Sequence, residues 1–421
     1  MTRSDTERLR GAETSRRRLL AVSGGAALAA LGLAGCGTEH DGGGGRLASA
    51  RAQASARAQG KVNAPPARGV LAANVNQALD RIDFAELAAV GGTWIRGFYV
   101  MTDADRGDPA SQAGLARLLN ASARGYGTVL STKFQYRDQP IPAPGSPAMK
   151  TALARLTKVL AATLGKVDIL TIGNEPFFET RQADRATARI NAFYEALAAH
   201  AVQYRQAHFG ARCKTELYMG ALNALDQPGG QTAQTRRWMT FTARTPGIAG
   251  VDVHPHVASL AAAQKYLDYV LPFLRADQRF LATEFSLVQL WKQHMTDPVN
   301  PAFARRHGIA VGTPVWQVVK GATQHHMDEQ TWNDFLLSNQ WFAADRNFLA
   351  EQMRRFRATG KLAVAGYGIT QDAAMAANVG PHTPPWLLNS LFCPYTCKPG
   401  PQGLPGRNRT WAAEFRAAQQ R

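Results

Sequence analysis

Residues 167–176 read VDILTIGNEP, a short run of apolar and β-branched residues that ends in an amide and a carboxylate. A continuous apolar run of this length is typical of a strand that is buried on both faces in a parallel sheet. Asn174 and Glu175 follow directly, and polar groups at the end of such a strand are costly unless they are paired or hydrogen-bonded. The stretch therefore predicts a parallel strand with a functional site at its carboxyl end.

Similar apolar runs recur along the chain, each separated from the next by enough residues for the crossover helix that parallel strands require. They lie at residues 69–73, 93–99, 128–131, 216–220, 250–253, 280–283 and 362–367. Eight strand–helix units predict an α/β fold, a (β/α)8 TIM barrel, with a long insertion between strands seven and eight. A doubly wound open sheet is the alternative, and its nucleotide-binding form is disfavoured because no glycine-rich phosphate loop follows an early strand.

The first 66 residues differ in composition from the rest. Residues 15–20 read SRRRLL, and an apolar run rich in glycine, alanine and leucine leads to LAGC at 33–36. A basic segment, a short apolar core and a small-residue end predict an export signal over residues 1–35. The paired arginines resemble a twin-arginine signal, and LAGC resembles the lipobox of bacterial lipoproteins, which would place the lipid on Cys36. An ordinary secretory signal with an unrelated cysteine is the alternative.

Residues 36–66 contain four successive glycines and a doubled ASARAQ, and they predict a flexible tether. The catalytic domain then spans residues 67–421. These segments predict a protein that is exported and lipid-anchored to the bacterial cell envelope, on the periplasmic or outer-membrane face. The formal net charge is +17, but the arginines are scattered and the chain is exported, so nucleic acid is not an expected partner.

Three cysteines remain beyond the predicted lipidation site. Cys393 and Cys397 are spaced to close a small loop, and an exported compartment permits oxidation. They predict a local disulfide, with a metal clip as the alternative. Cys213 is expected to be a lone thiol.

Two glutamates stand at the ends of predicted strands. Glu175 follows the fourth strand, and Glu284 follows the seventh, in LATEF at 281–285. In a TIM barrel the chemistry lies at the carboxyl ends of the strands, and strands four and seven lie nearly opposite each other. Their side chains can therefore converge over the mouth of the barrel. Retaining glycoside hydrolysis uses such a pair, a nucleophile and an acid/base, about 5–5.5 Å apart.

With these residues the chain resembles clan A of the glycoside hydrolases, over roughly residues 67–370. Asn-Glu-Pro at 174–176 matches the clan's strand-four motif, which implies that Glu175 is the acid/base and that Asn174 contacts the sugar 2-hydroxyl. By the same resemblance, Glu284 is the nucleophile.

The resemblance also implies two supporting residues. Arg96, on the second strand, would hydrogen-bond the nucleophile and keep it ionised, and His254, at the end of the sixth strand, would contact the site. The substrate implied is a β-linked poly- or oligosaccharide, and no cofactor is expected.

The chain departs from the clan's pattern at the eighth strand, where a tryptophan platform for the sugar is common. Tyr367 stands near that point and is expected to replace it. Asn223, after the fifth strand, and Trp291, in the loop after Glu284, are also expected to contact the substrate.

Two other classes of function compete with this interpretation. His254 and His256, with a histidine pair downstream at 325–326, invite a metal-dependent hydrolase, but no close metal-ligand spacing exists and no metal is expected. A barrel that binds polysaccharide without cleaving it is the second alternative, and the intact carboxylate pair argues against it. The sequence therefore predicts a retaining glycoside hydrolase with a two-glutamate double-displacement mechanism.

Overall fold

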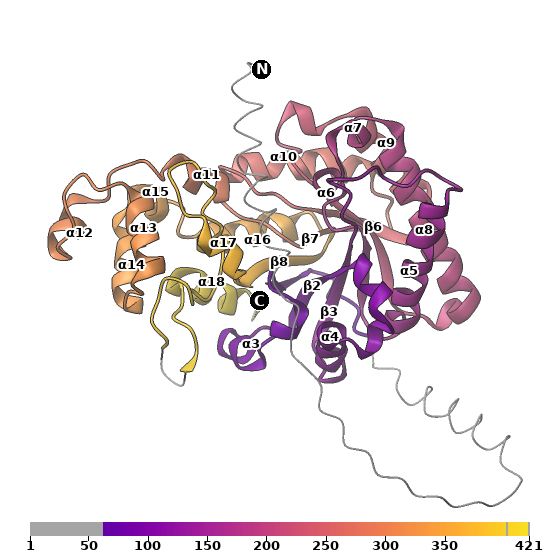
Figure 1. Cartoon of the computed structure of the whole chain (residues 1–421), viewed down its shortest axis with the longest axis horizontal. Helices are drawn as coiled ribbons and strands as arrows, with labels where there is room; N and C mark the ends of the chain where they lie inside the picture. Colours follow the sequence, from indigo (N-terminus) through magenta and orange to yellow (C-terminus); the bar gives the residue numbers. More distant parts are fainter. Residues whose placement is uncertain (1–61, 401–402, 420–421) are drawn as a thin grey trace, which may run out of the picture. The chain divides into compact units, whose positions relative to one another are not determined.

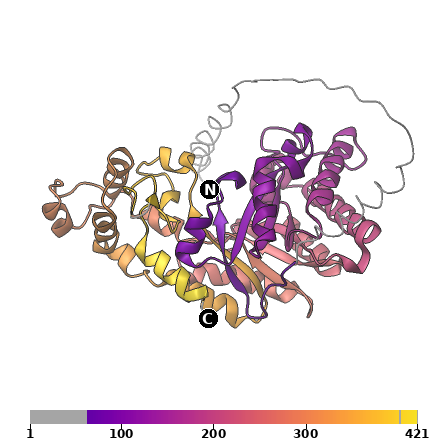
Figure 2. The ribbon, with the colours of Figure 1, turned by 90° about the horizontal axis from the view of Figure 1, so that it is seen from below.

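The computed structural model describes residues 62–400 and 403–419, and these fold into a closed barrel of eight parallel strands (Figures 1 and 2). The strands are hydrogen-bonded in chain order, and the first pairs with the last to close the barrel. Their bounds are β1 (Val70–Val75), β2 (Trp94–Val100), β3 (Gly127–Lys133), β4 (Ile169–Ile172), β5 (Glu216–Leu222), β6 (Ile248–Val253), β7 (Arg279–Ala282) and β8 (Leu362–Thr370). All eight predicted strands are present, so the TIM barrel is confirmed and the open sheet is wrong.

Helices lie between successive strands and cover the outside of the barrel (Figure 1). The longer ones are α3 (Phe84–Val90), α4 (Ala113–Ala123), α5 (Pro147–Thr163), α8 (Ala188–Phe209), α9 (Ala233–Arg244), α10 (Leu260–Val270), α13 (Val315–Gln324), α14 (Glu329–Ser338), α16 (Phe348–Ala358) and α18 (Arg409–Gln419). The shorter ones are α6 (Pro176–Glu179), α7 (Gln182–Arg185), α11 (Val288–Gln293), α12 (Pro301–Arg306), α15 (Gln340–Ala343) and α17 (Ala373–Ala377). The connection between β7 and β8 carries α11 to α16, and α12 to α15 lie together on one side of the barrel in Figure 1.

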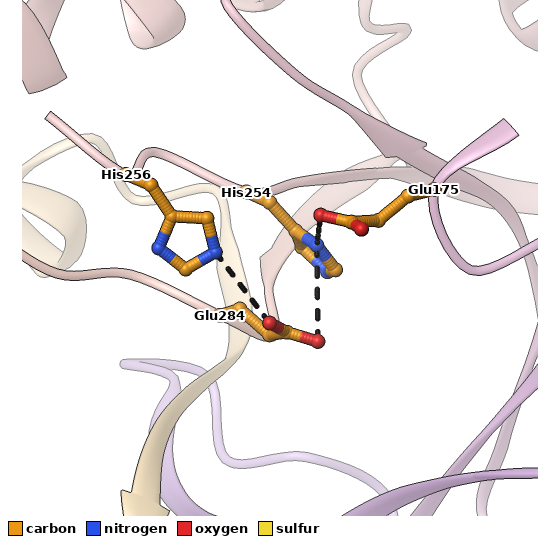
Figure 3. A group of neighbouring side chains, drawn as sticks. All are labelled: Glu175, His254, His256 and Glu284. Atoms are coloured by element: carbon orange, nitrogen blue, oxygen red, sulfur yellow. Dashed lines mark hydrogen bonds and ion pairs between the residues drawn. The ribbon is translucent and has the colours of Figure 1, made fainter. Parts of the chain in front are cut away.

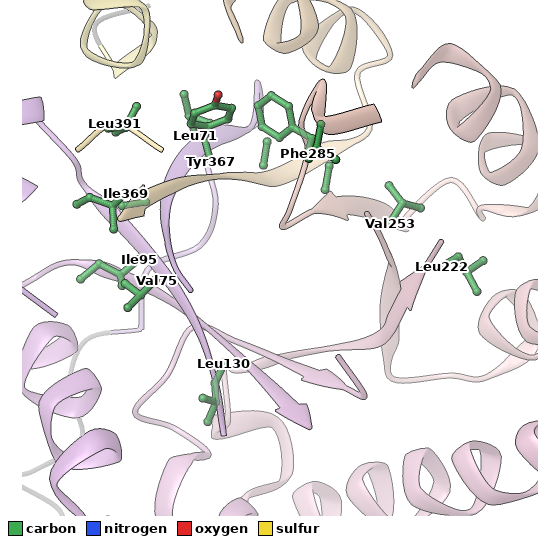
Figure 4. Packing of buried hydrophobic residues seen from close by; sticks show 14 of the residues in the cluster. Leu71, Val75, Ile95, Leu130, Leu222, Val253, Phe285, Tyr367, Ile369 and Leu391 are labelled. Carbon is green, nitrogen blue, oxygen red and sulfur yellow. The ribbon is translucent and has the colours of Figure 1, made fainter. Parts of the chain in front are cut away.

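Two apolar layers hold the barrel together. The smaller one lies inside it and consists of Val70, Ala72, Trp94, Val129, Ile169, Tyr218, Leu281, Ala363 and Val364. The larger one lies between the strands and the helices, and Figure 4 shows part of it, including Leu71, Ile95 and Leu130. Because successive side chains of a strand point to opposite faces, β1 contributes Val70 to the inner layer and Leu71 to the outer one.

Two glycines allow neighbouring strands to approach closely near the mouth of the barrel. A Cβ on Gly366 of β8 would lie 2.2 Å from the carbonyl oxygen of Thr283, and a Cβ on Gly220 of β5 would lie 2.6 Å from that of Gly173. Any side chain at these positions would displace backbone. Both oxygens belong to the segments that follow β7 and β4, so the glycines help to place the two predicted catalytic glutamates.

The predicted export signal, its Cys36 and most of the predicted tether lie outside the described residues. The last part of that tether packs against the barrel instead of hanging free. The guanidinium of Arg279 donates to the carbonyl oxygens of Pro65 at 3.1 Å and Pro66 at 2.6 Å, just before β1 begins. Among the described residues, no helix is both long and apolar enough to cross a membrane.

The predicted disulfide between Cys393 and Cys397 is not formed in the structure, where both are buried free thiols. The small loop is closed instead by its backbone, since the N–H of Cys397 donates to the carbonyl oxygen of Cys393 at 2.9 Å. The hydrogen bond with Cys397, together with burial, raises the pKa of the Cys393 thiol well above its usual value. Cys213 is a half-buried free thiol, as predicted.

A carboxylate on α18 hydrogen-bonds the first turn of α16 and makes stability depend on pH. Glu414 accepts from the N–H of Ala350 at 3.1 Å, and burial raises its pKa from 4.5 to about 7. The folded chain therefore holds this proton more tightly than the unfolded chain, so its contribution to stability is complete below pH 4.5 and is lost as the pH rises through 7.

We expect Glu414→Gln to keep the hydrogen-bond acceptor without the charge. It should raise the free energy of unfolding by about 1 kcal/mol at pH 8 and leave it unchanged near pH 4, as measured by urea denaturation. Glu351→Gln on α16 is the control, because hydrogen bonds from Arg354 and Arg355 lower the pKa of Glu351 to about 2, so that variant should show no gain. An equal gain from Glu414→Gln at both pH values would contradict the assignment.

Candidate active site

Four side chains from three strand ends meet at the mouth of the barrel (Figure 3). Glu175 follows β4, His254 and His256 follow β6, and Glu284 follows β7. One nitrogen or carboxylate oxygen from each lies within 4.8 Å of those of the others. The two predicted catalytic glutamates and the predicted His254 are therefore brought together.

A tight turn after β4 delivers Glu175 to this point. The strand ends at Ile172, and Gly173 adopts a φ of 95°, a left-handed conformation that glycine accepts without strain. Glu175 is then the N-cap of the short helix α6, which begins at Pro176. Pro176 occupies the first position of this helix, which suits its fixed φ.

Glu284 lies two residues beyond the end of β7, and positive groups surround it. A guanidinium nitrogen of Arg96 lies 2.6 Å from its Oε1, and His256 Nε2 lies 3.5 Å from its Oε2. Burial alone would raise the pKa of Glu284, but the charges of His254 and Arg96 and a hydrogen bond from His256 hold it well below the ordinary carboxyl value. Glu284 is therefore an ionised carboxylate at neutral pH.

Arg96 has no exposed side-chain surface and satisfies its donors with groups from several strand ends. Its Nε donates to the Ser131 hydroxyl at 3.2 Å, and its Nη1 donates to Asn74 Oδ1 at 3.0 Å as well as to Glu284. Its Nη2 donates to Asn174 Oδ1. The contact between Arg96 and Glu284 that the sequence predicted is present.

His254 lies between the two glutamates. Its Nδ1 is 3.2 Å from Glu175 Oε1 and 3.9 Å from Glu284 Oε1, and its Nε2 is 2.9 Å from the Thr283 hydroxyl. Burial alone would lower its pKa, but the carboxylates of Glu284, Asp252 and Glu175 raise it from 6.5 to about 10. The imidazole is therefore a buried cation in contact with both carboxylates.

Asn174 is buried and holds other side chains in place. Its Oδ1 accepts from Arg96, and its Nδ2 donates to Glu179 Oε1 at 2.8 Å. Glu179 is only 2% exposed, since α6 turns it inward toward Asn174 and Lys133. Burial raises the pKa of Glu179 against the opposing charge of Lys133, 3.4 Å away. A contact between Asn174 and a sugar hydroxyl stays a prediction.

Asn223 and one unpredicted tryptophan complete the surroundings. Asn223 Nδ2 donates to Glu175 Oε1 at 2.9 Å, so it lies where the sequence placed it. Trp386 is half-buried, and its ring meets that of His256 edge-on with centroids 4.8 Å apart. The sequence did not indicate Trp386, because this residue lies in the long segment after β8 and not at the end of a strand.

Two predicted substrate contacts are wrong. Tyr367 is fully buried in the middle of β8, which continues to Thr370, and its ring packs between Phe285 and Trp411 in the outer apolar layer. Trp291 is also fully buried, because the expected loop after Glu284 contains the helix α11, whose buried face packs Trp291 near Trp411. Neither ring can stack on a sugar at the mouth.

The cluster of two histidines and two glutamates also has the donor atoms of a divalent-metal site. Its charges favour another interpretation, because Arg96 already lies 2.6 Å from Glu284 and His254 is itself a cation. A metal ion would add a third positive centre to these two. The downstream pair His325 and His326 is exposed and is not part of this cluster.

No protein-family model and no curated protein matches this chain. Among solved structures, a thermostable mutant of the xylanase Xyn10A from Cellvibrio japonicus is 14% identical with a TM-score of 0.48, and the match covers 84% of this chain and 98% of that one. The native form of CbXyn10B is 11% identical with a TM-score of 0.47, covering 83% and 96%. The β-glycosidase BGL167 is 10% identical with a TM-score of 0.45, covering 80% and 84%. At these scores the likeness carries no argument about function, which must come from the site.

We expect Arg96→Met to lower the free energy of unfolding by about 3–5 kcal/mol, because it leaves Glu284 buried without its partner. Adding Glu284→Gln removes that unpaired charge, so the double variant should lose about 1–3 kcal/mol less than the sum of the single variants. Urea denaturation at pH 7 measures both. Arg155→Met, which breaks an exposed ion pair with Asp105, should cost less than about 1 kcal/mol. Strict additivity of the Arg96 and Glu284 variants would show that the pair is not coupled.

Proposed function

We propose that this protein is a retaining glycoside hydrolase that cleaves a β-linked poly- or oligosaccharide. The observation that supports it best is the separation of Glu175 and Glu284, whose nearest oxygens lie within 4.8 Å at the mouth of a TIM barrel. Retaining enzymes need a gap of about 5–5.5 Å, whereas inverting enzymes leave about 6.5–9.5 Å for a water molecule. The β linkage follows from the resemblance of the Asn-Glu-Pro motif.

The surroundings of the two glutamates support a different role for each. Arg96 lies 2.6 Å from Glu284, and together with His254 it holds the pKa of that carboxyl well below its usual value, so Glu284 is the carboxylate that stays ionised and suits a nucleophile. Glu175 faces the amide of Asn223 and the imidazole of His254, and it takes the part of the acid/base. Each group then has one task that its environment favours.

The reaction proceeds in two displacements. In the first, an oxygen of Glu284 bonds to the anomeric carbon while the glycosidic C–O bond breaks, and the leaving oxygen takes the proton of Glu175. In the second, ionised Glu175 takes a proton from a water molecule, whose oxygen attacks the anomeric carbon as the bond to Glu284 breaks. Both residues return to their starting states, and the configuration of the sugar is retained.

We expect Glu284→Ala to lose at least about 10³-fold in turnover of an aryl β-glycoside, since the nucleophile is gone. Azide should restore part of the activity and give a glycosyl azide of inverted configuration. Glu175→Ala with azide should instead give the retained azide, because Glu284 still forms the first bond. Proton NMR of the products measures both configurations.

Glu216→Gln is the matched control, because this glutamate begins β5 at the opposite end of the barrel and should leave turnover unchanged. An inverted natural product, or no rescue of either variant, would count against the mechanism. A polysaccharide-binding barrel would release no sugar from any β-glycan and would still bind one. Loss of activity on dialysis against a chelator, with recovery on adding zinc, would favour the metal-dependent alternative.

Trp386 is expected to form a wall for the sugar beside His256, because a half-buried indole offers a flat apolar face next to polar groups. Trp386→Ala should raise KM for an oligosaccharide about 10-fold and change kcat less, and Trp386→Phe should recover most of the loss. Steady-state kinetics measures this. Trp316→Ala on α13, at an equally half-buried position, should leave KM unchanged. An unchanged KM in Trp386→Ala would remove this residue from the site.

A further inference from the structure

A buried carboxylate that the proposed mechanism does not use lies behind the catalytic pair. Asp252 is fully buried in β6, beside Leu281 of β7. Its Oδ1 accepts from the backbone N–H of Thr283 at 3.0 Å, and its Oδ2 accepts from the Thr283 hydroxyl. The same Oδ2 lies 3.5 Å from His254 Nε2. Asp252 therefore contacts both the residue next to Glu284 and the imidazole between the glutamates.

The hydrogen bonds that link Asp252, Thr283 and His254 show which atoms carry the protons. The Thr283 hydroxyl gives its proton to Asp252, so its oxygen accepts from His254 Nε2, which must carry a hydrogen. On the other side of the ring, Nδ1 faces an oxygen of Glu175 and an oxygen of Glu284. The Glu175 oxygen, Oε1, already accepts from Asn223 Nδ2, and Glu284 is ionised, so Nδ1 faces two acceptor oxygens and carries a hydrogen as well. Both ring nitrogens donate, which makes the ring an imidazolium.

We propose that Asp252 is a positioning residue that keeps His254 charged, so that this charge supports Glu284 in the free enzyme and Glu175 once Glu284 carries the sugar. The inference rests on the proposed function. It adds a reason why a single histidine touches both glutamates.

The change of partner follows from the charges in each step. In the free enzyme, Glu284 is ionised and shares the positive charge of His254. When Glu284 becomes an ester it loses its negative charge, and Glu175, at 3.2 Å, becomes the carboxylate that the imidazolium stabilises. Ionised Glu175 is the form that accepts a proton from water in the second displacement. The charge of His254 thus favours the base just when a base is needed.

The charged and titratable neighbours of Asp252 and His254 named below are consistent with a charged His254. Arg96 donates to Glu284 Oε1, the same oxygen that lies 3.9 Å from His254 Nδ1. The His256 ring lies 6.0 Å from the His254 ring, and its Nε2 faces Glu284. Tyr218 of β5 lies near Asp252, and burial raises its pKa well above its usual value, so it stays neutral. Asp252 is therefore the carboxylate behind His254.

An asparagine at position 252 should reverse the proton arrangement. Its amide can turn an N–H toward the Thr283 oxygen, and the hydroxyl would then donate to His254 Nε2. The imidazole would keep its hydrogen on Nδ1 but lose its charge. The matched control is Asp168→Asn. Asp168 is also buried and accepts from the N–H and hydroxyl of a threonine, Thr128, but it lies at the amino end of β4, away from the site.

The first experiment needs no substrate. Nitrogen-15 NMR of histidine-labelled protein, with His254→Gln to assign the signal, should show both His254 nitrogens protonated at pH 8 in the unmodified chain and in Asp168→Asn. In Asp252→Asn the titration midpoint of His254 should fall by more than about one pH unit. A neutral His254 in the unmodified chain, or an unchanged midpoint in Asp252→Asn, would overturn the inference.

The second experiment measures the reaction with a dinitrophenyl β-glycoside, whose good leaving group makes the second displacement limit kcat. Asp252→Asn should lower kcat by about 10-fold and change kcat/KM by less than about threefold, since the first displacement needs no acid here. Asp168→Asn should change neither. An equal fall in kcat and kcat/KM would mean that Asp252 supports the site only as a structural residue.

A second pair of variants keeps the test decisive if Asp252→Asn does not fold. Thr283→Ser retains the hydroxyl that joins Asp252 to His254, and Thr283→Val removes it at equal size. The valine variant should lower the His254 midpoint and kcat, and the serine variant should change neither; equal behaviour of the two would refute the link. If the unmodified protein cleaves no glycan, the proposed function fails, and the NMR experiment still decides whether Asp252 keeps His254 charged.

Discussion

A guanidinium that is wholly shielded from water must find an acceptor for its N–H groups inside the protein, and the mouth of this barrel is arranged around that requirement. Arg96 meets it with Asn74 from β1, Ser131 from β3, Asn174 after β4 and Glu284 after β7. One side chain therefore fixes four strand ends relative to one another. Removing any of these acceptors would leave a buried donor unpaired, which costs more than the hydrogen bond itself contributes.

The same side chain makes the two glutamates chemically different. Two carboxylates within 4.8 Å of each other do not both ionise easily, so the nearest fixed charge decides which one does. Arg96 is joined to Glu284 at 2.6 Å, whereas Glu175 accepts from the amide of Asn223 and lies 3.2 Å from the shared imidazole. The asymmetry that a nucleophile and an acid/base require thus comes from a residue on β2, a strand that carries neither glutamate.

The fold and the four charged residues at the mouth of the barrel could be predicted from the sequence because each depends on a short, local stretch of residues. Parallel strands appear as apolar runs, and Arg96, Glu175, His254 and Glu284 stand in or just after such runs, where a barrel brings side chains to one mouth. What the sequence could not reveal depends on contacts between distant segments. Tyr367 was misplaced because β8 runs on to Thr370, so this residue lies within the strand, and its ring faces Phe285 and Trp411 in the outer apolar layer.

Buried partners were equally invisible in the sequence. Nothing in the sequence indicates that α6 turns Glu179 toward Asn174 and Lys133, or that Asp252, within β6, contacts Thr283 and His254. For Cys393 and Cys397, by contrast, the sequence predicted a bond that the structure does not contain. A spacing that suits a disulfide also suits an ordinary backbone turn. Spacing along the chain tells which residues can meet, and only the packed structure tells what they do when they meet.

Two buried aspartate–threonine pairs have the same hydrogen bonds but different surroundings. At the amino end of β4, Asp168 accepts from the N–H and hydroxyl of Thr128, and near the carboxyl end of β6 Asp252 accepts from the same two groups of Thr283. The local geometry is shared, and at the first pair it joins neighbouring strands. At the second, the threonine precedes Glu284 and its oxygen accepts from an imidazole, so the same joint also sets a charge. At the first pair the contact only joins two strands. At the second pair the Thr283 oxygen also accepts from His254, which lies between two carboxylates, so the same contact keeps a proton on His254 Nε2.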